Sequence, residues 1–167
     1  MTDTLTLNGS ERIAVQKSGP GRFEVQATYQ PRGERPPMHV HPAHTEEFTV
    51  LSGVLRVDCA GSVRDYRAGE SFDIASGVAH RMWNGGDEPA TVRWISAPAA
   101  RVESFFRAMD ALHRAGTTSL LSKAGVLREY KDVMRPSSAV TRLLVNVLGA
   151  LRPAPPTVLA PAGQEAL

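Results

Sequence analysis

Between Arg12 and about Ala97, apolar and polar residues alternate with a period of two. The pattern comes in short runs, such as RFEVQATY and ATVRWIS, and Gly, Pro and Asp residues separate one run from the next. Side chains of a β-strand point alternately to its two faces, so this period predicts strands with one face in a core and the other in water. Many short strands of this kind favour an antiparallel sandwich or barrel.

The period changes after the segment SAPAA at residues 96–100. Apolar residues then recur at the spacing of an amphipathic helix. Three stretches show this spacing: Val102, Phe105, Phe106, Met109 and Leu112; Leu120, Leu121, Ala124, Leu127 and Met134; and Val140, Leu143, Leu144, Val147, Leu148 and Leu151. We therefore expect a β domain over residues 1–100, a helical extension over 101–151 and a Pro- and Ala-rich tail over 152–167.

Charge and composition exclude several classes of function. The formal net charge is +2, and the basic residues are not clustered on one element, so no nucleic-acid partner is expected. The chain has no run of about 18 apolar residues and no basic-then-apolar leader. Its single cysteine, Cys59, cannot form an internal disulfide bond. These features together predict a cytoplasmic protein.

The segment HVHPAHTEE at residues 39–47 holds three of the five histidines. On a strand, His39 and His41 point to the same side, and Glu46 could return to that side after the turn PAHT. His80, which follows the turn ASGVA, is a fourth candidate ligand. Imidazoles and a carboxylate suit one divalent transition-metal ion, such as Fe(II), Mn, Ni, Co or Zn. The sequence thus predicts a metal site at His39, His41, Glu46 and His80.

Three neighbouring or similar side chains are expected to stay outside this site. His44 lies in the turn, where we expect it to be solvated; the less favoured alternative is that it supports the metal ligands or has a gating role. The strand alternation turns Glu47 to the outer surface. His113, near the end of the first helical stretch, is interpreted as a partner of the helix dipole.

Two stretches resemble the signatures of the cupin superfamily. Residues 33–53, GERPPMHVHPAHTEEFTVLSG, match G-x5-H-x-H-x4-E-x6-G at every specified position. Residues 69–84, GESFDIASGVAHRMWN, are similar to G-x5-P-x-G-x2-H-x3-N, but Ala75 stands where proline is usual. That departure affects one turn and no candidate ligand.

The resemblance covers roughly residues 20–98. It implies a single-domain cupin with a mainly β, double-stranded β-helix (jelly-roll) barrel. It also implies that the metal lies at the centre of the barrel, among His39, His41, Glu46 and His80. Small single-barrel cupins commonly pair through their sheets, so a homodimer is expected, and exposed sheet edges and apolar helix faces also need covering.

The phase of the strands suggests an apolar pocket around the metal, lined by Phe48, Val50, Phe72, Ile74 and Met82. Such a pocket favours a small, moderately hydrophobic organic molecule. The expected function is a metal-dependent enzyme with a dioxygenase-type or an isomerase-, cyclase- or lyase-type reaction. Glu46 and Tyr29 are the candidate catalytic acid–base groups. The alternative is a non-catalytic module that binds or senses a small molecule.

The helical extension could cap the barrel, pair with another subunit or lie on a membrane. Between Val133 and Gln164 there are three arginines and no acidic residue, which is typical of a helix at a membrane interface. Because three arginines are few, we favour packing or dimerisation, and membrane contact is not expected.

Overall fold

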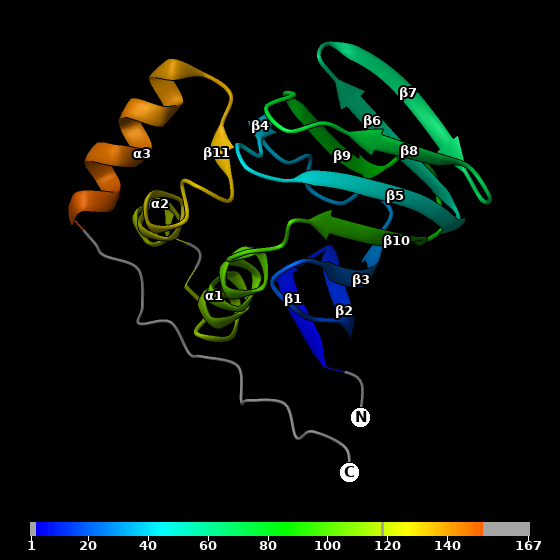
Figure 1. The fold of residues 1–167 in the computed structure, drawn as a ribbon, viewed down its shortest axis with the longest axis horizontal. Helices are drawn as coiled ribbons and strands as arrows, with labels where there is room; N and C mark the ends of the chain where they lie inside the picture. Colours follow the sequence, from blue (N-terminus) through cyan, green and yellow to red (C-terminus); the bar gives the residue numbers. More distant parts are fainter. Residues whose placement is uncertain (1–2, 118, 152–167) are drawn as a thin grey trace.

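The computed structural model describes residues 3–117 and 119–151, and Figure 1 shows their arrangement. The strands of this part of the chain are β1 (Thr4–Asn8), β2 (Glu11–Lys17), β3 (Phe23–Tyr29), β4 (His39–Val40), β5 (Thr45–Ser52), β6 (Val54–Cys59), β7 (Ser62–Arg67), β8 (Ser71–Ile74), β9 (His80–Asn84), β10 (Ala90–Ala97) and β11 (Arg135–Pro136). The helices are α1 (Val102–Arg114), α2 (Leu120–Glu129) and α3 (Ala139–Leu151).

The strands form two antiparallel sheets. One sheet has the order β1-β2-β3-β10-β5-β8, and the other has the order β11-β4-β9-β6-β7. Strands far apart in the sequence are neighbours, because β10 lies between β3 and β5. The predicted mainly β fold with C-terminal helices is confirmed.

The alternation of apolar residues produces the core. In β3 the side chains of Phe23, Val25, Ala27 and Tyr29 are buried, whereas those between them are half-buried or exposed. Strand β10 adds Trp94, which lies directly opposite Phe48 of β5 in the strand register. Burial of such apolar surface is the main stabilising contribution to a sheet sandwich of this kind.

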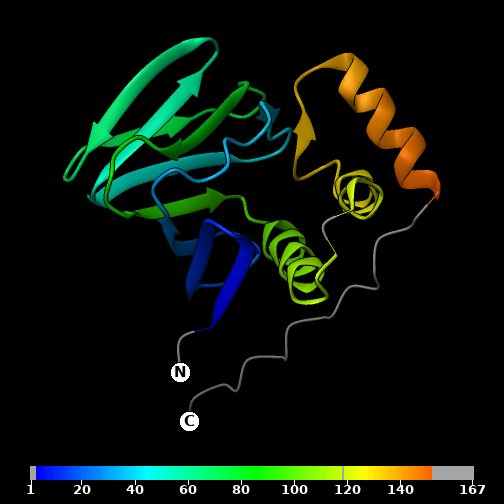
Figure 2. The ribbon, with the colours of Figure 1, turned by 180° about the vertical axis from the view of Figure 1, so that it is seen from behind.

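The helices stack beside one end of the barrel, with α3 outermost, as the two opposite views show (Figures 1 and 2). Helix α1 joins the core through Phe106, whose ring lies 6.1 Å from that of Phe23 and 5.1 Å from that of Trp94. Helix α2 contacts both α1 and α3. Strand β10 ends at Ala97 and α1 begins at Val102, so the predicted boundary at residue 100 falls between these two elements. The predicted tail over 152–167 lies outside the described residues.

The second helical stretch is shorter than predicted, because Met134 lies beyond α2. The helix ends at Glu129, and Pro136 then lies in β11, which pairs with β4 through Arg135 opposite Val40 and Pro136 opposite His39. Proline disfavours helical geometry in the residue before it, so the helix cannot continue through Arg135. No helix among the described residues has the length and apolar character needed to cross a bilayer.

Candidate metal centre

The four predicted metal ligands lie together inside the barrel. The pairing of β4 with β9 places His39 opposite His80, with ring centroids 4.5 Å apart, and the His41 ring lies 5.1 Å from that of His80. Glu46 enters from β5. Its Oε1 atom lies 3.3 Å from Nε2 of His41, and its Oε2 atom lies 3.1 Å from Nε2 of His80. His41 and His80 thus both contact Glu46, and His39 lies beside His80.

The turn before β9 carries His80 to this point. The backbone N–H of Gly77 donates to the carbonyl oxygen of His41 at 2.8 Å, and the hydroxyl of Ser76 donates to that of Pro42 at 2.8 Å. Gly77 has a φ of 78°, a left-handed conformation that glycine adopts without strain. Ala75, which departs from the signature, is exposed, and these hydrogen bonds hold the turn without a proline.

Hydrogen bonds to the backbone orient all three of these imidazoles. Each Nδ1 atom lies close to a carbonyl oxygen: 3.0 Å for His39 and Pro37, 2.8 Å for His41 and Val133, and 2.9 Å for His80 and Val78. A carbonyl oxygen can only accept, so Nδ1 carries the proton and Nε2 keeps a free lone pair. This tautomer is the one that binds a metal through Nε2, with the other nitrogen held in place by the protein.

One of these acceptors comes from the C-terminal extension. The carbonyl oxygen of Val133, between α2 and β11, accepts the hydrogen bond from His41. The adjacent pairing of β11 with β4, together with a hydrogen bond from the N–H of Ser137 to the carbonyl of Met38, holds this segment on the ligand strand. The extension is therefore a structural part of the candidate metal centre.

The electrostatics of the cluster favour an ionised carboxylate beside neutral His39 and His41. Burial and the neighbouring histidines lower the pKa of His39 to about 3. Burial also lowers the pKa of His41. Burial by itself would raise the pKa of Glu46, but its contacts with His41, His44 and His80 outweigh this and hold the pKa below its usual range. Burial by itself would lower the pKa of His80, but its contact with Glu46 outweighs this and raises the pKa, so a bound cation would compete with a proton at His80.

Several polar atoms of the cluster are buried without a hydrogen-bond partner among the described residues. They are Nε2 of His44, Oε2 of Glu46 and Nε2 of His80. The last two lie 3.1 Å apart but lack the alignment of a hydrogen bond. An unpaired buried polar atom costs about 1–3 kcal/mol, and a cation bound between these atoms would remove that cost. The residues therefore fit a divalent metal ion.

His44 also belongs to the cluster, so the expectation that it is solvated is wrong. Its side chain is 3% exposed, its ring lies 4.5 Å from that of His41, and its Nε2 atom lies 3.8 Å from Oε1 of Glu46. The ligand atoms of His41, His44 and Glu46 all lie within 4.8 Å of one another, as do those of His39, His41 and His80. Because His44 shares the strand phase of Glu46, the alternation itself contained this signal. Glu47 is exposed, as expected, and His113 is exposed in the last turn of α1.

A tryptophan that was not predicted orients the carboxylate. The indole N–H of Trp94 donates to Oε1 of Glu46 at 3.1 Å. Trp94 is held in turn by Phe48 and Phe106, whose ring centroids lie 5.5 Å and 5.1 Å from its own. This aromatic group leaves Oε2 of Glu46 as the oxygen without a hydrogen bond.

The cluster faces a cavity of about 480 Å³ between the barrel and the helices. Its walls are mainly apolar, and they include Phe48, Met82 and Trp94 from the barrel as well as Phe105, Phe106, Met109, Leu120, Leu144 and Leu148 from the helices. A space of this size can hold a small organic molecule beside the four predicted ligands, all of which line it.

The five predicted pocket residues divide into two groups. Phe48 and Met82 line the cavity, whereas Val50 and Ile74 are buried in the core. Phe72 stacks on Phe48, with ring centroids 4.9 Å apart, and lies outside the described lining. Strand phase predicts on which side of a strand a residue lies, but not how far along the strand the cavity extends.

A second polar group in the cavity wall was missed. Glu11 of β2 lies opposite Tyr29 of β3, their side chains share a hydrogen bond, and Nδ2 of Asn8 donates to Oε2 of Glu11 at 3.3 Å. Burial raises the pKa of Glu11 to about 7, and the charge of Glu46 adds to this effect. Burial raises the pKa of Tyr29 well above its usual value, so its phenol stays protonated. In β2, Glu11 shares the inward phase of Ile13 and Val15, and this alternation was the available signal.

The raised pKa of Glu11 makes stability depend on pH. Its folded-state pKa of about 7 exceeds the ordinary value of 4.5, so the folded protein binds more protons in this window and stability falls as pH rises through it. Glu11→Gln removes the ionisation. The free energy of unfolding of Glu11→Gln minus that of wild type should therefore be about 2–3 kcal/mol larger at pH 8 than at pH 5, as measured by urea unfolding. A difference that does not change with pH, or one that Glu47→Gln reproduces, would contradict the assignment.

Comparison with known proteins agrees with this geometry. The family model described as "Cupin domain" matches residues 25–96. Oxalate oxidase 2 of Hordeum vulgare is 39% identical over 104 residues, covering 54% of this chain and 46% of that protein. Germin-like protein 3-3 of Oryza sativa subsp. japonica is 40% identical over 72 residues, covering 38% of this chain and 31% of that protein. The chain thus spans about a third to a half of the length of these relatives.

Solved structures share the fold at lower sequence identity. An RmlC-like cupin from Shewanella frigidimarina NCIMB 400 superposes with a TM-score of 0.53 at 19% identity, covering 59% of this chain and 85% of that one. KdgF from Halomonas sp. gives a TM-score of 0.51 at 18% identity, covering 57% and 86%. Residues 25–96 thus match the cupin family model, and the fold of this part of the chain is similar to that of these solved structures.

Proposed function

We propose that this protein is a metal-dependent enzyme that acts on a small, moderately hydrophobic organic molecule bound in the barrel cavity. The observation that carries the proposal is the cluster of His39, His41, Glu46 and His80, which is buried, oriented by the backbone and open to an apolar cavity. Buried polar groups of this kind are costly to a fold, and they are typical of functional sites.

The metal would be one divalent transition-metal ion, of which Fe(II), Mn, Ni, Co and Zn suit the imidazole and carboxylate ligands. Such an ion supplies Lewis acidity, and Fe or Mn also supplies redox chemistry with dioxygen. His44 lies close enough to Glu46 to hold the carboxylate or to replace one of the four ligands. The other residues that line the cavity would bind and orient the substrate.

The reaction class follows from two kinds of support. The oxalate oxidases among the relatives favour an oxidative reaction, and the dioxygenase type is the oxidative form of the proposal. The apolar lining of the cavity favours a larger and less charged substrate than oxalate. An isomerase-, cyclase- or lyase-type reaction is the second form of the proposal, because Glu11 and Tyr29 provide a proton acceptor and a proton donor on the same cavity wall.

The residues of the chain have distinct roles in either reaction. Glu11, with a pKa of about 7, can exchange a proton with the substrate near neutral pH, and Tyr29 can donate a hydrogen bond to a substrate oxygen. Trp94 keeps Glu46 in its ligand orientation. Phe48, Phe105 and Phe106 exclude water from the cavity. Sequence analysis predicted catalytic roles for Glu46 and Tyr29, and the structure adds Glu11 as a candidate proton acceptor.

The alternative is a module that binds a small molecule without catalysis, and one variant separates the two functions. Glu46→Gln keeps the size of the side chain but removes its negative charge, so metal affinity should fall by about 10- to 100-fold. An enzyme should then lose turnover of phenolic and diketone test substrates, and chelation should have the same effect.

The measurement combines turnover with calorimetric titration of any bound compound in wild type, Glu46→Gln and chelated protein. Glu47→Gln is the matched control, because this neighbour is exposed on the outer surface and should leave turnover and binding unchanged. Ligand affinity that is the same in all four samples, without turnover in any, would favour the binding module over the enzyme.

A further inference from the structure

His44 is a buried histidine that the four-residue ligand set leaves without a role. Its side chain is 3% exposed, and its Nε2 atom has no hydrogen-bond partner among the described residues. A nitrogen atom that is removed from water and left unpaired destabilises a fold, and in folded proteins such atoms are nearly always satisfied. The position of His44 therefore calls for a partner that the polypeptide itself does not supply.

The carboxylate of Glu46 is close to His44 but is not that partner. Nε2 of His44 lies 3.8 Å from Oε1 of Glu46, which is too far for a hydrogen bond. The same oxygen already accepts the indole N–H of Trp94 at 3.1 Å. His44 thus faces the carboxylate without bonding to it.

The spacing around Glu46 is that of atoms that share one ion. Two ligand atoms that each lie about 2.1 Å from an ion are themselves about 3.0–4.2 Å apart, from neighbouring to opposite positions. The carboxylate oxygens of Glu46 lie 3.1 Å from Nε2 of His80, 3.3 Å from Nε2 of His41 and 3.8 Å from Nε2 of His44. All three separations fall in this range, so His44 fits as well as the two predicted ligands do.

His41 connects His44 to the other histidines. The ligand atoms of His41, His44 and Glu46 lie within 4.8 Å of one another, and so do those of His39, His41 and His80. Because Nδ1 of His41 donates to the carbonyl oxygen of Val133 at 2.8 Å, only its Nε2 atom is free to bind, and one lone pair binds one ion. The two groups of ligand atoms therefore describe one ion with ligands on both sides, and not two ions.

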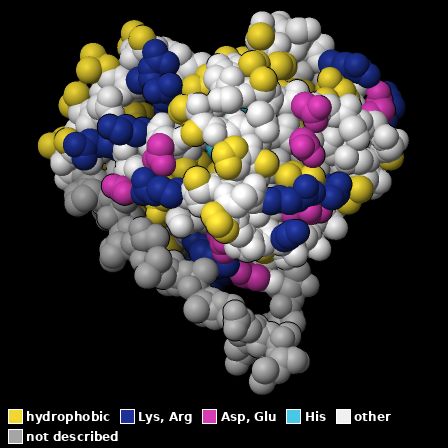
Figure 3. Space-filling view, in the orientation of Figure 1, with side chains coloured by type: hydrophobic (Ala, Val, Ile, Leu, Met, Phe, Trp, Pro, Cys, Tyr) yellow, Lys and Arg dark blue, Asp and Glu magenta, His cyan; other side chains and the backbone are white. Residues whose placement is uncertain are grey.

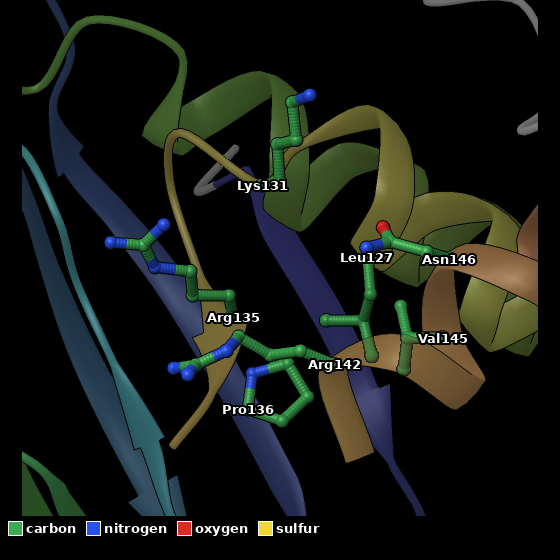
Figure 4. Close-up of a pocket in the computed structure, with 7 residues that line it drawn as sticks. All are labelled: Leu127, Lys131, Arg135, Pro136, Arg142, Val145 and Asn146. Carbon is green, nitrogen blue, oxygen red and sulfur yellow. The ribbon is translucent and has the colours of Figure 1, made fainter. Parts of the chain in front are cut away.

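His44 lies on the side of the cluster that the cavity does not reach. The four predicted ligands line the cavity, whereas His44 is outside its described lining. Next to the ligand strand β4, Pro136 of β11 shares a small pocket with Leu127 of α2 and Val145 of α3 (Figure 4), so the helices hold β11 in place there. On the face that Figure 3 shows, only traces of the cyan of histidine side chains reach the surface. A bond from His44 to the ion would therefore leave the cavity side of the ion open.

We propose that His44 is a fifth protein ligand of the ion, in addition to His39, His41, Glu46 and His80. A six-coordinate ion then keeps one position for a molecule from the cavity. This position selects a substrate that reaches the ion through a single atom, such as a phenol, over a diketone that chelates through two. The choice of substrate rests on the proposed function, whereas the role of His44 rests on metal binding alone.

A first substitution separates a metal ligand from a side chain that only holds Glu46. His44→Gln keeps an N–H donor that can reach the carboxylate but removes the imidazole. The affinity of the full chain for Co(II), measured by competition with a chelator, should fall by at least about tenfold. His113→Gln is the matched control, because His113 is exposed at the end of α1, and its affinity for Co(II) should equal that of wild type.

A second substitution tests the number of open positions. The relaxation of solvent protons by bound Mn(II) reports how many water molecules the ion holds. Wild type should hold one and His44→Ala should hold two, so the relaxation rate per bound ion should rise about twofold in the variant. Acetylacetone, which chelates through two oxygens, should lower the relaxation rate of His44→Ala and leave that of wild type unchanged.

The outcomes distinguish this inference from the proposed function. Equal relaxation rates in Mn(II)-loaded wild type and His44→Ala would overturn the role of His44 and leave the metal centre intact, even if affinity had fallen, because His44 would then only support Glu46. Unchanged Co(II) affinity in His44→Gln, shown by circular dichroism to be folded, would overturn it as well. Wild type that binds neither ion would overturn the metal centre of the proposed function and this inference together.

Discussion

Phe48→Ala should lower the free energy of unfolding by about 3–5 kcal/mol, the cost of emptying a fully buried aromatic position. The Phe48 side chain is 1% exposed, and its ring stacks on Phe72 and Trp94 at centroid distances of 4.9 Å and 5.5 Å. Its loss also removes support from Trp94, whose indole N–H holds the carboxylate of Glu46. Urea unfolding at neutral pH measures the change, and metal affinity should fall with it.

Phe72→Ala is the matched comparison on the neighbouring strand. Phe72 is half-buried and lies outside the described cavity lining, so the same substitution should cost less, about 1–2 kcal/mol, and should leave metal affinity unchanged. Equal losses of stability in the two variants would show that Phe48 is not a central packing residue of the cavity wall.

The parts of the fold that the sequence predicted depend on local patterns. The period of two identifies strands such as β3 and β10, and the spacing of His39, His41 and Glu46 is set within a single strand–turn–strand unit. His80 was found through the resemblance of its own turn and strand to the second signature. Such features need no knowledge of which strands become neighbours, and this is why they could be predicted.

The parts that were missed depend on contacts between distant segments. The Val133 carbonyl lies 92 residues from His41, and the Trp94 indole lies 48 residues from Glu46. Glu11 becomes significant only because β2 and β3 pair and place it beside Tyr29. Sheet order decides all three contacts, and no local spacing contains that order.

The third helix shows a different limit of sequence reasoning. Its heptad-like spacing predicted an amphipathic element over residues 140–151, but not whether its apolar stripe would be covered. The structure covers the side formed by Val145 and Gly149 and leaves the stripe with Val147 exposed. The preference for packing over membrane contact rested on the small number of arginines in this segment, and it stays a prediction. The expected homodimer stays a prediction.

His39→Ala with His41→Ala should abolish stoichiometric metal binding while the β-rich domain remains folded. The substitution removes two of the four predicted ligands, and the remaining Glu46, His80 and His44 would hold an ion far more weakly. The fold should persist because the barrel core lies in β3, β5 and β10, and alanine fits both strand positions. His113→Ala is the matched control, since this histidine is exposed at the end of α1 and should not affect the ion.

Elemental analysis of protein purified without a histidine tag tests the metal centre most directly. Wild type and His113→Ala should each contain about one divalent transition-metal ion per chain, whereas the His39 and His41 double variant should contain none at the same protein concentration. Circular dichroism of each sample confirms that the domain is folded. Full metal occupancy in the folded double variant would contradict the assignment of the site.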